Sequence, residues 1–340
     1  MDSLVQGISY NELHSVGIGQ PRMLELLKPW GRAIKYNYML RRARKLANHA
    51  NLALPETSSI ELPPIHFFFG CGRSGTTILG RVFGTHPEVC YLFEPYHSWA
   101  AIDDRTDMVH LYVEGEARCI MRAEDASDAI RARFEHVIVR EGLRRNLPAV
   151  IEKTPINALR LGYLNELAPT ARYVHISRDG MDVCRSIVKR AEAADSRIAG
   201  VPNYNHWWGR HGVKWDSLAR DGAAAGYYAD EISALQNDMA KGAYEWLVTQ
   251  REVQKYRATL NSRFYEITYS DLTHHPRETI IGICQFLGLS TPDSWIAEVT
   301  STIKPGRHGG DDVLRLPPTM ANDFNNAQSR FAFAGRAAST

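Results

Sequence analysis

The sequence lacks a Cys-x-x-Cys pair, a run of about 18 consecutive apolar residues and any marked excess of one charge. Its five cysteines are scattered and odd in number, so neither a disulfide framework nor a zinc site is predicted. With 40 Lys and Arg against 38 Asp and Glu, the formal net charge of +2 argues against nucleic acid as a partner. The first ten residues lack the basic flank and apolar core of a signal peptide. We therefore expect a soluble, unprocessed protein of a reducing compartment, the cytoplasm.

Composition and pattern divide the chain into unequal parts. The 340 residues, of which 44% are hydrophobic and 23% charged, are typical of a globular enzyme without internal repeats. Residues 1–60 read as an N-terminal helical extension, residues 61–310 as an α/β domain, and residues 311–340 as a C-terminal tail. From Pro305 onward the sequence is rich in Gly, Ala and Asn, which predicts a partly loose structure. A basic helix is predicted from Trp30 to Asn51. Its cations are typical of a solvated face, and a peripheral contact with a membrane is the alternative.

Short apolar segments alternate with helical patterns from Ile65 onward. The first, Ile65 to Phe69, is closed by Gly70 and a glycine-punctuated turn. The patterns predict further strands at 149–151, 172–177 and 263–268. They predict helices at 76–84, 126–144, 158–167, 180–194 and 277–287. This alternation is typical of α/β proteins, so we expect a P-loop-like, doubly wound parallel sheet flanked by helices.

Residues 194–244 interrupt this alternation. They are rich in Gly, Asn and aromatic side chains and show no strand pattern, so we interpret them as an aromatic-rich cap inserted into the α/β domain. Aromatic residues of such a cap suit a satellite hydrophobic core and a substrate-lining surface equally well. Those in question are Trp207, Trp208, Trp215, Tyr227 and Tyr228.

A glycine-rich loop at residues 70–77, with the sequence GCGRSGTT, follows the first strand and opens a helix. Backbone N–H groups converge on an anion in this context. Its glycines permit a tight turn and a close backbone approach, its hydroxyls add hydrogen-bond donors, and its arginine supplies positive charge. The loop is therefore predicted to bind a phosphate. The candidate binding residues are Gly72, Arg73, Ser74, Gly75, Thr76 and Thr77.

The loop departs from the nucleoside-triphosphatase pattern G-x-x-x-x-G-K-[ST] at one position, because Thr76 replaces the lysine. Without that lysine the grip on the β- and γ-phosphates is missing, and no later predicted strand ends in an acidic residue suited to hold Mg²⁺. A Mg²⁺-dependent kinase for a nucleotide or small molecule is therefore an alternative rather than the first choice. No metal site is expected.

A second strand, turn and helix pattern covers residues 173–186. Arg178 follows the carboxyl end of the strand, where ligands bind in open α/β sheets, and Ser186 lies about two helical turns later. The planar guanidinium suits a phosphate, and the serine hydroxyl completes the cradle. An ion pair of Arg178 with Asp179 or Asp182 is the structural alternative. Two anion sites at the ends of parallel strands call for a nucleotide phosphorylated at two separated positions.

Residues 73–77 and 178–186 together resemble the 5′-phosphosulfate and 3′-phosphate motifs of sulfotransferases that use 3′-phosphoadenosine 5′-phosphosulfate (PAPS). The resemblance extends from about residue 65 to residue 307, nearest to a bacterial branch that is also similar to tyrosylprotein sulfotransferases. It implies PAPS as the donor and 3′-phosphoadenosine 5′-phosphate (PAP) as the product. It also implies that Arg73 to Thr77 hold the 5′-phosphosulfate and that Arg178 and Ser186 hold the 3′-phosphate.

The resemblance assigns roles to further residues. Glu94 stands where tyrosylprotein sulfotransferases carry a catalytic glutamate, so a general base is implied, and Lys153 is implied to contact the oxygen between sulfate and phosphate. Tyr269 resembles a family tyrosine near the nucleotide. Lys304 and Arg307 lie in a segment similar to a loop over the 3′-phosphate, but the usual Gly-Arg/Lys-Trp continuation is absent. A solvated basic turn is the alternative there.

The predicted reaction moves a sulfuryl group from PAPS to a hydroxyl of a small-molecule, carbohydrate or lipid acceptor. Positioning and charge stabilisation dominate such a transfer, and a base takes the acceptor proton. His97 is the rival of Glu94 for that role, because an imidazole titrates near neutral pH, although it also reads as an ordinary partly buried histidine. A non-catalytic nucleotide-binding protein is a further alternative. The sequence selects neither an acceptor nor an oligomeric state.

Overall fold

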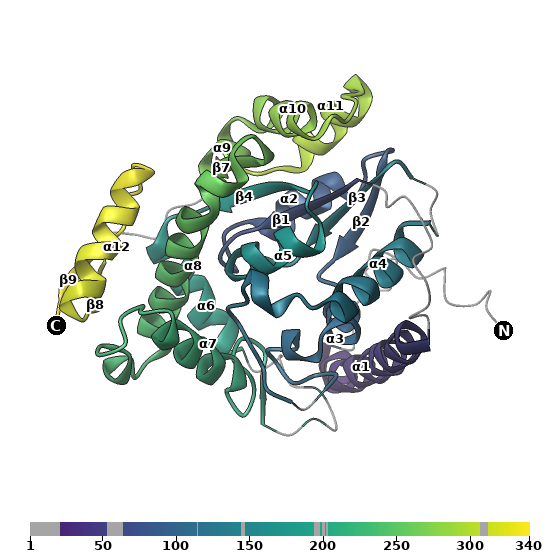
Figure 1. The fold of residues 1–340 in the computed structure, drawn as a ribbon. Helices are drawn as coiled ribbons and strands as arrows, with labels where there is room; N and C mark the ends of the chain where they lie inside the picture. The colour runs from purple at the N-terminus through teal and green to yellow at the C-terminus, as the bar shows by residue number, and fades with distance from the viewer. Residues whose placement is uncertain are drawn as a thin grey trace.

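A parallel β-sheet forms the centre of the molecule (Figure 1). The computed structural model describes residues 21–52, 64–113, 115–143, 147–193, 198, 201, 203–306 and 312–340. The sheet has five strands in the order β2-β3-β1-β4-β7, and every neighbouring pair is parallel. The strands are β1 (Ile65–Phe69), β2 (Val89–Phe93), β3 (Ala149–Lys153), β4 (Arg172–Ser177) and β7 (Phe264–Thr268). The predicted α/β class and flanked parallel sheet are therefore confirmed.

The central strand β1 is buried on both faces because helices cover both sides of the sheet. Successive side chains of a strand point to opposite faces, and Phe68 packs on one side while Phe67 and Phe69 pack on the other. The Phe68 side is covered by α2 (Thr76–Phe83), α10 (Pro276–Leu287) and α11 (Asp293–Thr302). The opposite side is covered by α3 (Tyr96–Ile102), α4 (Asp128–Leu143), α5 (Leu161–Leu167) and α8 (Asp238–Leu260).

The sequence patterns located four of the five strands of the sheet and missed β2, and they did not indicate α3, α8 or α11. The strands predicted at 65–69 and 172–177 have those limits, and the other two predicted strands form with slightly shifted ends. The helix expected at 158–167 begins only at Leu161, after a short 3₁₀ turn at Pro155–Leu159. The edge strand β2 was not predicted, because it has only five residues and comes directly after the turn that ends α2.

The N-terminal helix α1 (Pro21–Leu52) lies against α3 and α4 (Figure 1). Ala43 and Leu46 are buried on its inner side. Ile34 and Tyr38 are 73% and 62% exposed on its outer side, where Arg41 and Lys45 are exposed as well. No helix in the described ranges combines the length and the apolar character needed to cross a membrane. A peripheral membrane contact of α1 stays a prediction.

The cap contains regular structure that the sequence did not indicate. A two-stranded antiparallel ladder joins β5 (Tyr204–Asn205) to β6 (Gly209–Arg210), and α7 (Val213–Ala224) follows, so the expectation of a strand-free segment is wrong. The predicted cap limit at 244 falls inside α8. Among the cap aromatics, Trp208 and Tyr228 are buried in a hydrophobic cluster with α8.

The C-terminal residues also fold, contrary to the expected loose tail. Strands β8 (Val313–Leu316) and β9 (Arg336–Ser339) pair in parallel around α12 (Pro318–Arg330), which packs against α8. Leu316, Met320 and Phe324 are fully buried there. The Gly and Ala content of this segment concealed an apolar face on α12.

The C-terminal unit, which consists of β8, α12 and β9, is hydrogen-bonded to the turn between β4 and α6 (Gly180–Ala191). Gln328 is fully buried; its Oε1 accepts from the Gly180 N–H at 2.9 Å, and its Nε2 donates to the Gly335 carbonyl at 3.1 Å. The Gly335 N–H donates to Asp179 Oδ2 at 2.8 Å. These bonds hold the turn directly after Arg178.

Replacing Gln328 with methionine should lower the free energy of unfolding by about 1–3 kcal/mol, because the buried Gly180 N–H loses its acceptor while side-chain length is kept. Urea unfolding followed by circular dichroism measures this change. The exposed Gln236→Met serves as the matched control and should shift stability by less than about 0.5 kcal/mol. Equal stability of the Gln328→Met variant and the parent protein would contradict the assigned role.

Candidate functional site

The loop after β1 forms a tight turn that only glycine permits at its end. Gly75 caps α2 with φ at 101°, and a Cβ atom there would lie 2.5 Å from Cδ2 of Tyr269. A Cβ atom on Gly72 would lie 2.4 Å from the ring of Trp207. The loop is therefore held between Tyr269, the first residue of α9 (Tyr269–His274), and a tryptophan of the cap. Trp207 thus belongs to the site, whereas Trp208 and Tyr228 belong to the core.

Cationic groups of the two predicted phosphate segments meet above this loop. Nη1 of Arg178 donates to the Arg73 carbonyl at 3.3 Å, and Nε of Arg73 donates to Ser186 Oγ at 2.9 Å. Ser186 therefore contacts Arg73 directly, so the two cradles are contiguous. Burial, followed by repulsion from the guanidinium groups of Arg190 and Arg178, lowers the pKa of Arg73, while Glu94 opposes the shift. A group of cations packed this closely favours a bound anion.

Buried polar atoms in this cluster have unused hydrogen-bonding capacity. Ser74 Oγ and Arg178 Nε are buried and have no hydrogen-bond partner in the described part of the chain. Arg178 also lies 3.3 Å from Asp182, so the alternative ion pair forms too, and its guanidinium carbon lies 4.4 Å from the ring centroid of Tyr269. A phosphorylated nucleotide would supply acceptors for these donors, so the residues present fit such a ligand.

The late basic segment is only partly described. A Cβ atom on Gly306 would lie 2.8 Å from Cε1 of Tyr269, so the backbone passes beside the cluster. Lys304 is exposed, and its contact with a nucleotide stays a prediction. Arg307 lies outside the described residues.

Glu94 follows β2 in a strained backbone conformation. Its φ is 42°, its N–H donates to the Lys153 carbonyl at 2.9 Å, and its carboxylate forms an ion pair with the Lys153 ammonium. Lys153 is fully buried, and its Nζ lies 4.1 Å from the ring centroid of Phe93. Burial lowers the pKa of Lys153, against the effect of Glu94. Glu94 is an acidic residue at the end of β2, but its carboxylate is engaged with a lysine.

Glu152 holds the segment that carries Lys153. Its carboxylate accepts from Trp99 Nε1 and Asn157 Nδ2, both at 2.9 Å, and from the Thr154 hydroxyl. Burial raises the pKa of Glu152 to about 7, although these hydrogen bonds act in the opposite direction. The buried carboxyl ties α3 to the end of β3, and therefore fixes the backbone on both sides of the Glu94–Lys153 pair.

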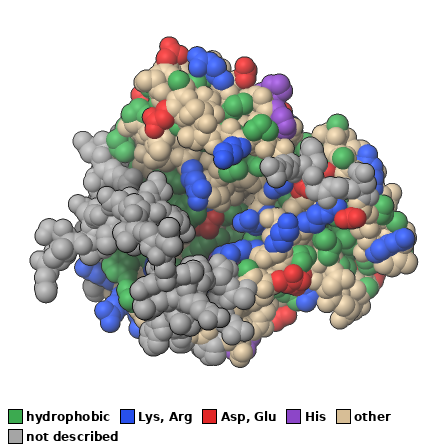
Figure 2. All heavy atoms as spheres, turned by 180° about the vertical axis from the view of Figure 1, so that it is seen from behind, with side chains coloured by type: hydrophobic (Ala, Val, Ile, Leu, Met, Phe, Trp, Pro, Cys, Tyr) green, Lys and Arg blue, Asp and Glu red, His purple; other side chains and the backbone are tan. Residues whose placement is uncertain are grey.

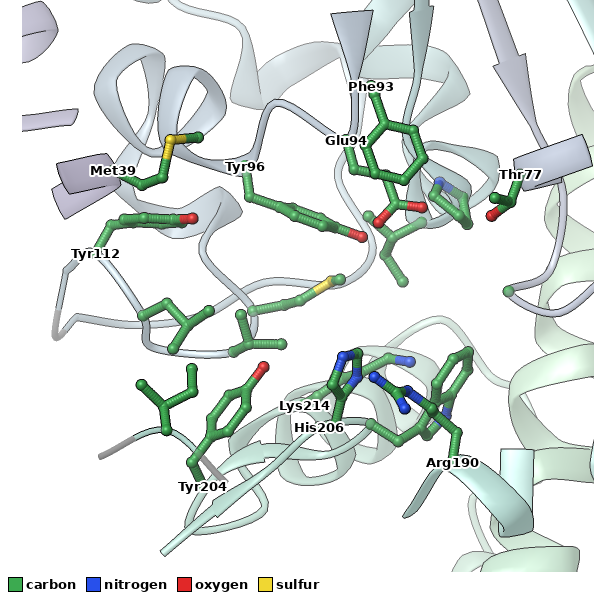
Figure 3. A pocket seen from close by; sticks show the side chains of 18 of the residues that line it. Met39, Thr77, Phe93, Glu94, Tyr96, Tyr112, Arg190, Tyr204, His206 and Lys214 are labelled. Carbon is green, nitrogen blue, oxygen red and sulfur yellow. The ribbon is translucent and has the colours of Figure 1, made fainter. Parts of the chain in front are cut away.

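A cavity of about 460 Å³ lies beside this pair and the loop. Figure 2 shows the hollowed face, with hydrophobic side chains inside it and Lys and Arg side chains gathered alongside. In Figure 3, Glu94 and Thr77 lie at one end, Met39 and Tyr112 at the other, and the Tyr96 hydroxyl points toward Glu94. The predicted site residues that line the cavity are Gly72, Arg73, Thr76, Thr77 and Glu94.

His97 does not line this cavity. It is 6% exposed within α3, and its Nε2 lies 3.3 Å from Ser98 Oγ. Its neighbour Tyr96 is the residue of α3 that reaches the cavity instead. The geometry therefore favours Glu94 over His97 as the group next to a bound acceptor.

Several lining residues were not singled out from the sequence. Arg190 lies one helical turn beyond Ser186 on α6, so its place on the same face could have been found from helical periodicity. Lys214 and Glu245 form a buried ion pair at 2.8 Å under the Trp207 ring. The contribution of α1 depends on tertiary packing and leaves no local signal in the sequence.

In the described part of the chain, no group of three or more His, Cys, Asp or Glu side chains is arranged to hold a metal ion. The five cysteines are all buried, and none of them forms a disulfide.

Comparison with known proteins gives consistent results. The sequence profile of the sulfotransferase family matches residues 64–215. A putative protein-tyrosine sulfotransferase from Caenorhabditis briggsae is 26% identical over 219 residues, which are 63% of this chain and 69% of that protein. Protein-tyrosine sulfotransferase A from Caenorhabditis elegans is 27% identical over 223 residues, 64% of this chain and only 54% of that protein.

Carbohydrate sulfotransferase 6 from Homo sapiens is 25% identical over an alignment of 284 residues that covers 69% of this chain and 67% of that protein. A crystal structure of a sulfotransferase from Mycobacterium tuberculosis overlaps 91% of this chain and 90% of its own, with 16% identity and a TM-score of 0.46. The matched segment 64–215 contains the glycine-rich loop, Glu94, Lys153, Arg178 and Ser186. Through the segment that holds these residues, the chain is similar to the sulfotransferase family.

Proposed function

We propose that the protein transfers a sulfuryl group from PAPS to the hydroxyl of an acceptor bound in the 460 Å³ cavity. The observation that carries the proposal is that Arg73, which lines the cavity together with Glu94, contacts both Arg178 and Ser186. Two adjoining anion cradles match a nucleotide with separate 5′ and 3′ groups. The relatives named for tyrosine and carbohydrate acceptors support a hydroxyl as the accepting group.

PAPS, when bound, supplies a sulfuryl group whose bond to the 5′-phosphate oxygen breaks as the acceptor oxygen bonds to sulfur. Residues of the loop at 72–77 hold the 5′ end through backbone N–H groups and the Arg73 guanidinium. Arg178 binds the 3′-phosphate, with its guanidinium supported by the Tyr269 ring. Ser186 orients Arg73 through its 2.9 Å hydrogen bond.

Glu94 and Lys153 divide the charge changes of the reaction between them. The Glu94 carboxylate takes the proton of the acceptor hydroxyl, and the Lys153 ammonium stabilises the negative charge that forms on the leaving phosphate oxygen. In the structure the two side chains form an ion pair with each other. Donor binding offers Lys153 a second anion, which weakens its hold on Glu94 and makes the carboxylate a better base.

Glu94→Gln should lower turnover roughly 10²–10⁴-fold, because the amide accepts no proton, while PAP affinity changes little. Transfer of ³⁵S from labelled PAPS to a panel of hydroxyl acceptors measures turnover, and calorimetric titration with PAP measures binding. Glu298→Gln, at an exposed position of α11, is the matched control and should keep parent activity. Turnover near that of the parent protein in the Glu94→Gln variant would exclude Glu94 as the base.

Arg178→Ala should weaken PAPS by roughly 10–100-fold but leave adenosine 5′-phosphosulfate nearly unchanged, because only PAPS presents a 3′-phosphate. Competition against labelled PAP measures both affinities. Arg185→Ala, on α6 just after Arg178, removes an arginine bound to Asp312 and should affect neither nucleotide. Equal losses for the two nucleotides would refute the 3′-phosphate assignment.

The alternatives predict different outcomes in the same assays. A kinase would show Mg²⁺-dependent turnover of ATP, whereas a non-catalytic nucleotide-binding protein would bind PAP and transfer no label in a single-turnover experiment. Transfer that persists in the presence of a chelator supports the proposal and excludes both.

A further inference from the structure

The walls of the cavity beyond Glu94 are mainly apolar and aromatic. They come from separate parts of the chain: α1, the end of β2 with the start of α3, the segment after α3, and the cap. The side chains concerned are Tyr36, Met39, Phe93, Tyr96, Met108, Val109, Leu111, Tyr112, Ile156 and Tyr204. An acceptor in this space contacts hydrocarbon and ring surfaces along most of its length.

Helix α1 supplies the far wall. Tyr36 and Met39 reach the cavity together with Arg32 and Lys35, whereas Ala43 and Leu46, one and two turns after Met39, pack against the domain. Ile34 points the opposite way and is 73% exposed. In Figure 3, Met39 and Tyr112 lie together at the end of the cavity away from Glu94. The N-terminal helix is therefore placed to decide which acceptor bodies fit.

Amide and carboxylate groups, which suit the hydroxyls of a sugar, are few on these walls. Among the described lining residues there is no Asn, Gln, Asp or Ser, and the carboxylates are Glu94 and Glu245. The other polar side chains are cations, one histidine, and Tyr and Thr hydroxyls; the cations are Arg32, Lys35, Arg73, Arg190 and Lys214. Glu94 is paired with Lys153, and Glu245 with Lys214. A sugar presents hydroxyls around its whole ring, and each one buried against an apolar wall without a partner lowers affinity. An apolar body meets no such cost and gains from burial.

From these walls we infer that the acceptor is a small molecule with a hydroxyl on an apolar body, either a phenol or a long-chain alcohol. Contacts with α1 determine which of these bodies fits the cavity. This inference rests on the proposed function. The apolar body lies between Met39 and Leu111, and the hydroxyl lies at Glu94. In the transfer, the acceptor oxygen bonds to sulfur, the bond between sulfur and the phosphate oxygen breaks, and the proton moves to Glu94. The products are a sulfate ester and PAP.

The first experiment compares acceptors with ³⁵S-labelled PAPS and the full chain. The probes are 2-naphthol, 1-decanol and methyl β-D-glucoside. We expect kcat/KM for one or both apolar probes to exceed that for the glucoside at least roughly 100-fold, because the hydroxyls of the glucoside lose their hydrogen-bond partners when they are buried against apolar walls. A preference for naphthol identifies the phenol and a preference for decanol the alkyl alcohol. A glucoside rate equal to that of both apolar probes would overturn the inference and leave the proposed function standing.

The second experiment tests the wall formed by α1. Met39→Asp should lower kcat/KM for the preferred probe roughly 10–100-fold, because a carboxylate replaces an apolar contact, while KM for PAPS stays unchanged. Met39→Leu should retain parent activity. Ile34→Asp, which places the same charge on the exposed side of α1, is the matched control and should have no effect. Leu111→Asn, on the facing segment, tests the same wall should Met39→Asp fail to fold.

A binding measurement separates failure of the inference from failure of the proposed function. In the presence of PAP, the fluorescence of 2-naphthol reports its binding without any transfer. Binding that Met39→Asp weakens and Ile34→Asp leaves intact, without sulfation of any probe, would reject sulfuryl transfer but keep the apolar site. Absence of binding by both apolar probes would overturn the apolar site itself.

Discussion

The candidate site depends on the close parallel pairing of β1 with β4. The backbones leave so little room where these strands end that a Cβ atom on Gly70 would lie 2.2 Å from the Ile176 carbonyl oxygen. Two turns that are far apart in the sequence therefore leave the sheet side by side, one carrying Arg73 and the other Arg178. Their positive charges are held together by backbone geometry, at an electrostatic cost that an anionic ligand removes.

Support for this arrangement comes from segments outside the central sheet. The C-terminal unit binds the turn after Arg178 through Gln328, and Trp246 Nε1 donates to the Arg178 carbonyl at 3.1 Å. The cap contributes Trp207 against Gly72, and Glu152 ties β3 to α3. The bonds from Gln328 and Trp246 engage backbone groups beside Arg178 rather than its guanidinium, which keeps hydrogen-bonding capacity for a ligand. Ser74 Oγ and Arg178 Nε show this capacity directly.

Sequence patterns predicted the part of the site that is local and failed for the part that is not. The loop at 70–77 and the Arg178 turn each carry their chemistry within a few residues of a strand end, so both were found. The strand β2 was missed because its five residues give too short a pattern. The pairing of β2 with β3, which places Glu94 at the same edge of the sheet as Lys153, was therefore missed as well. The cavity walls were missed because α1 and the segment around Tyr112 meet only through tertiary packing. Buried Trp208 and lining Trp207 are neighbours in sequence, and only their environments distinguish them.

Backbone strain is present at two residues that line the cavity, Arg73 and Glu94. Their φ angles are 74° and 42°, a region that costs a non-glycine residue about 1–3 kcal/mol and that glycine adopts freely. Glycine at either position would relieve this strain, as it does at the nearby Gly75. Selection for stability alone would favour that residue. Six other described non-glycine residues share this region, among them Tyr228 in the core, so strain alone does not mark a site. At Arg73 and Glu94 it falls on charged side chains that line the same cavity.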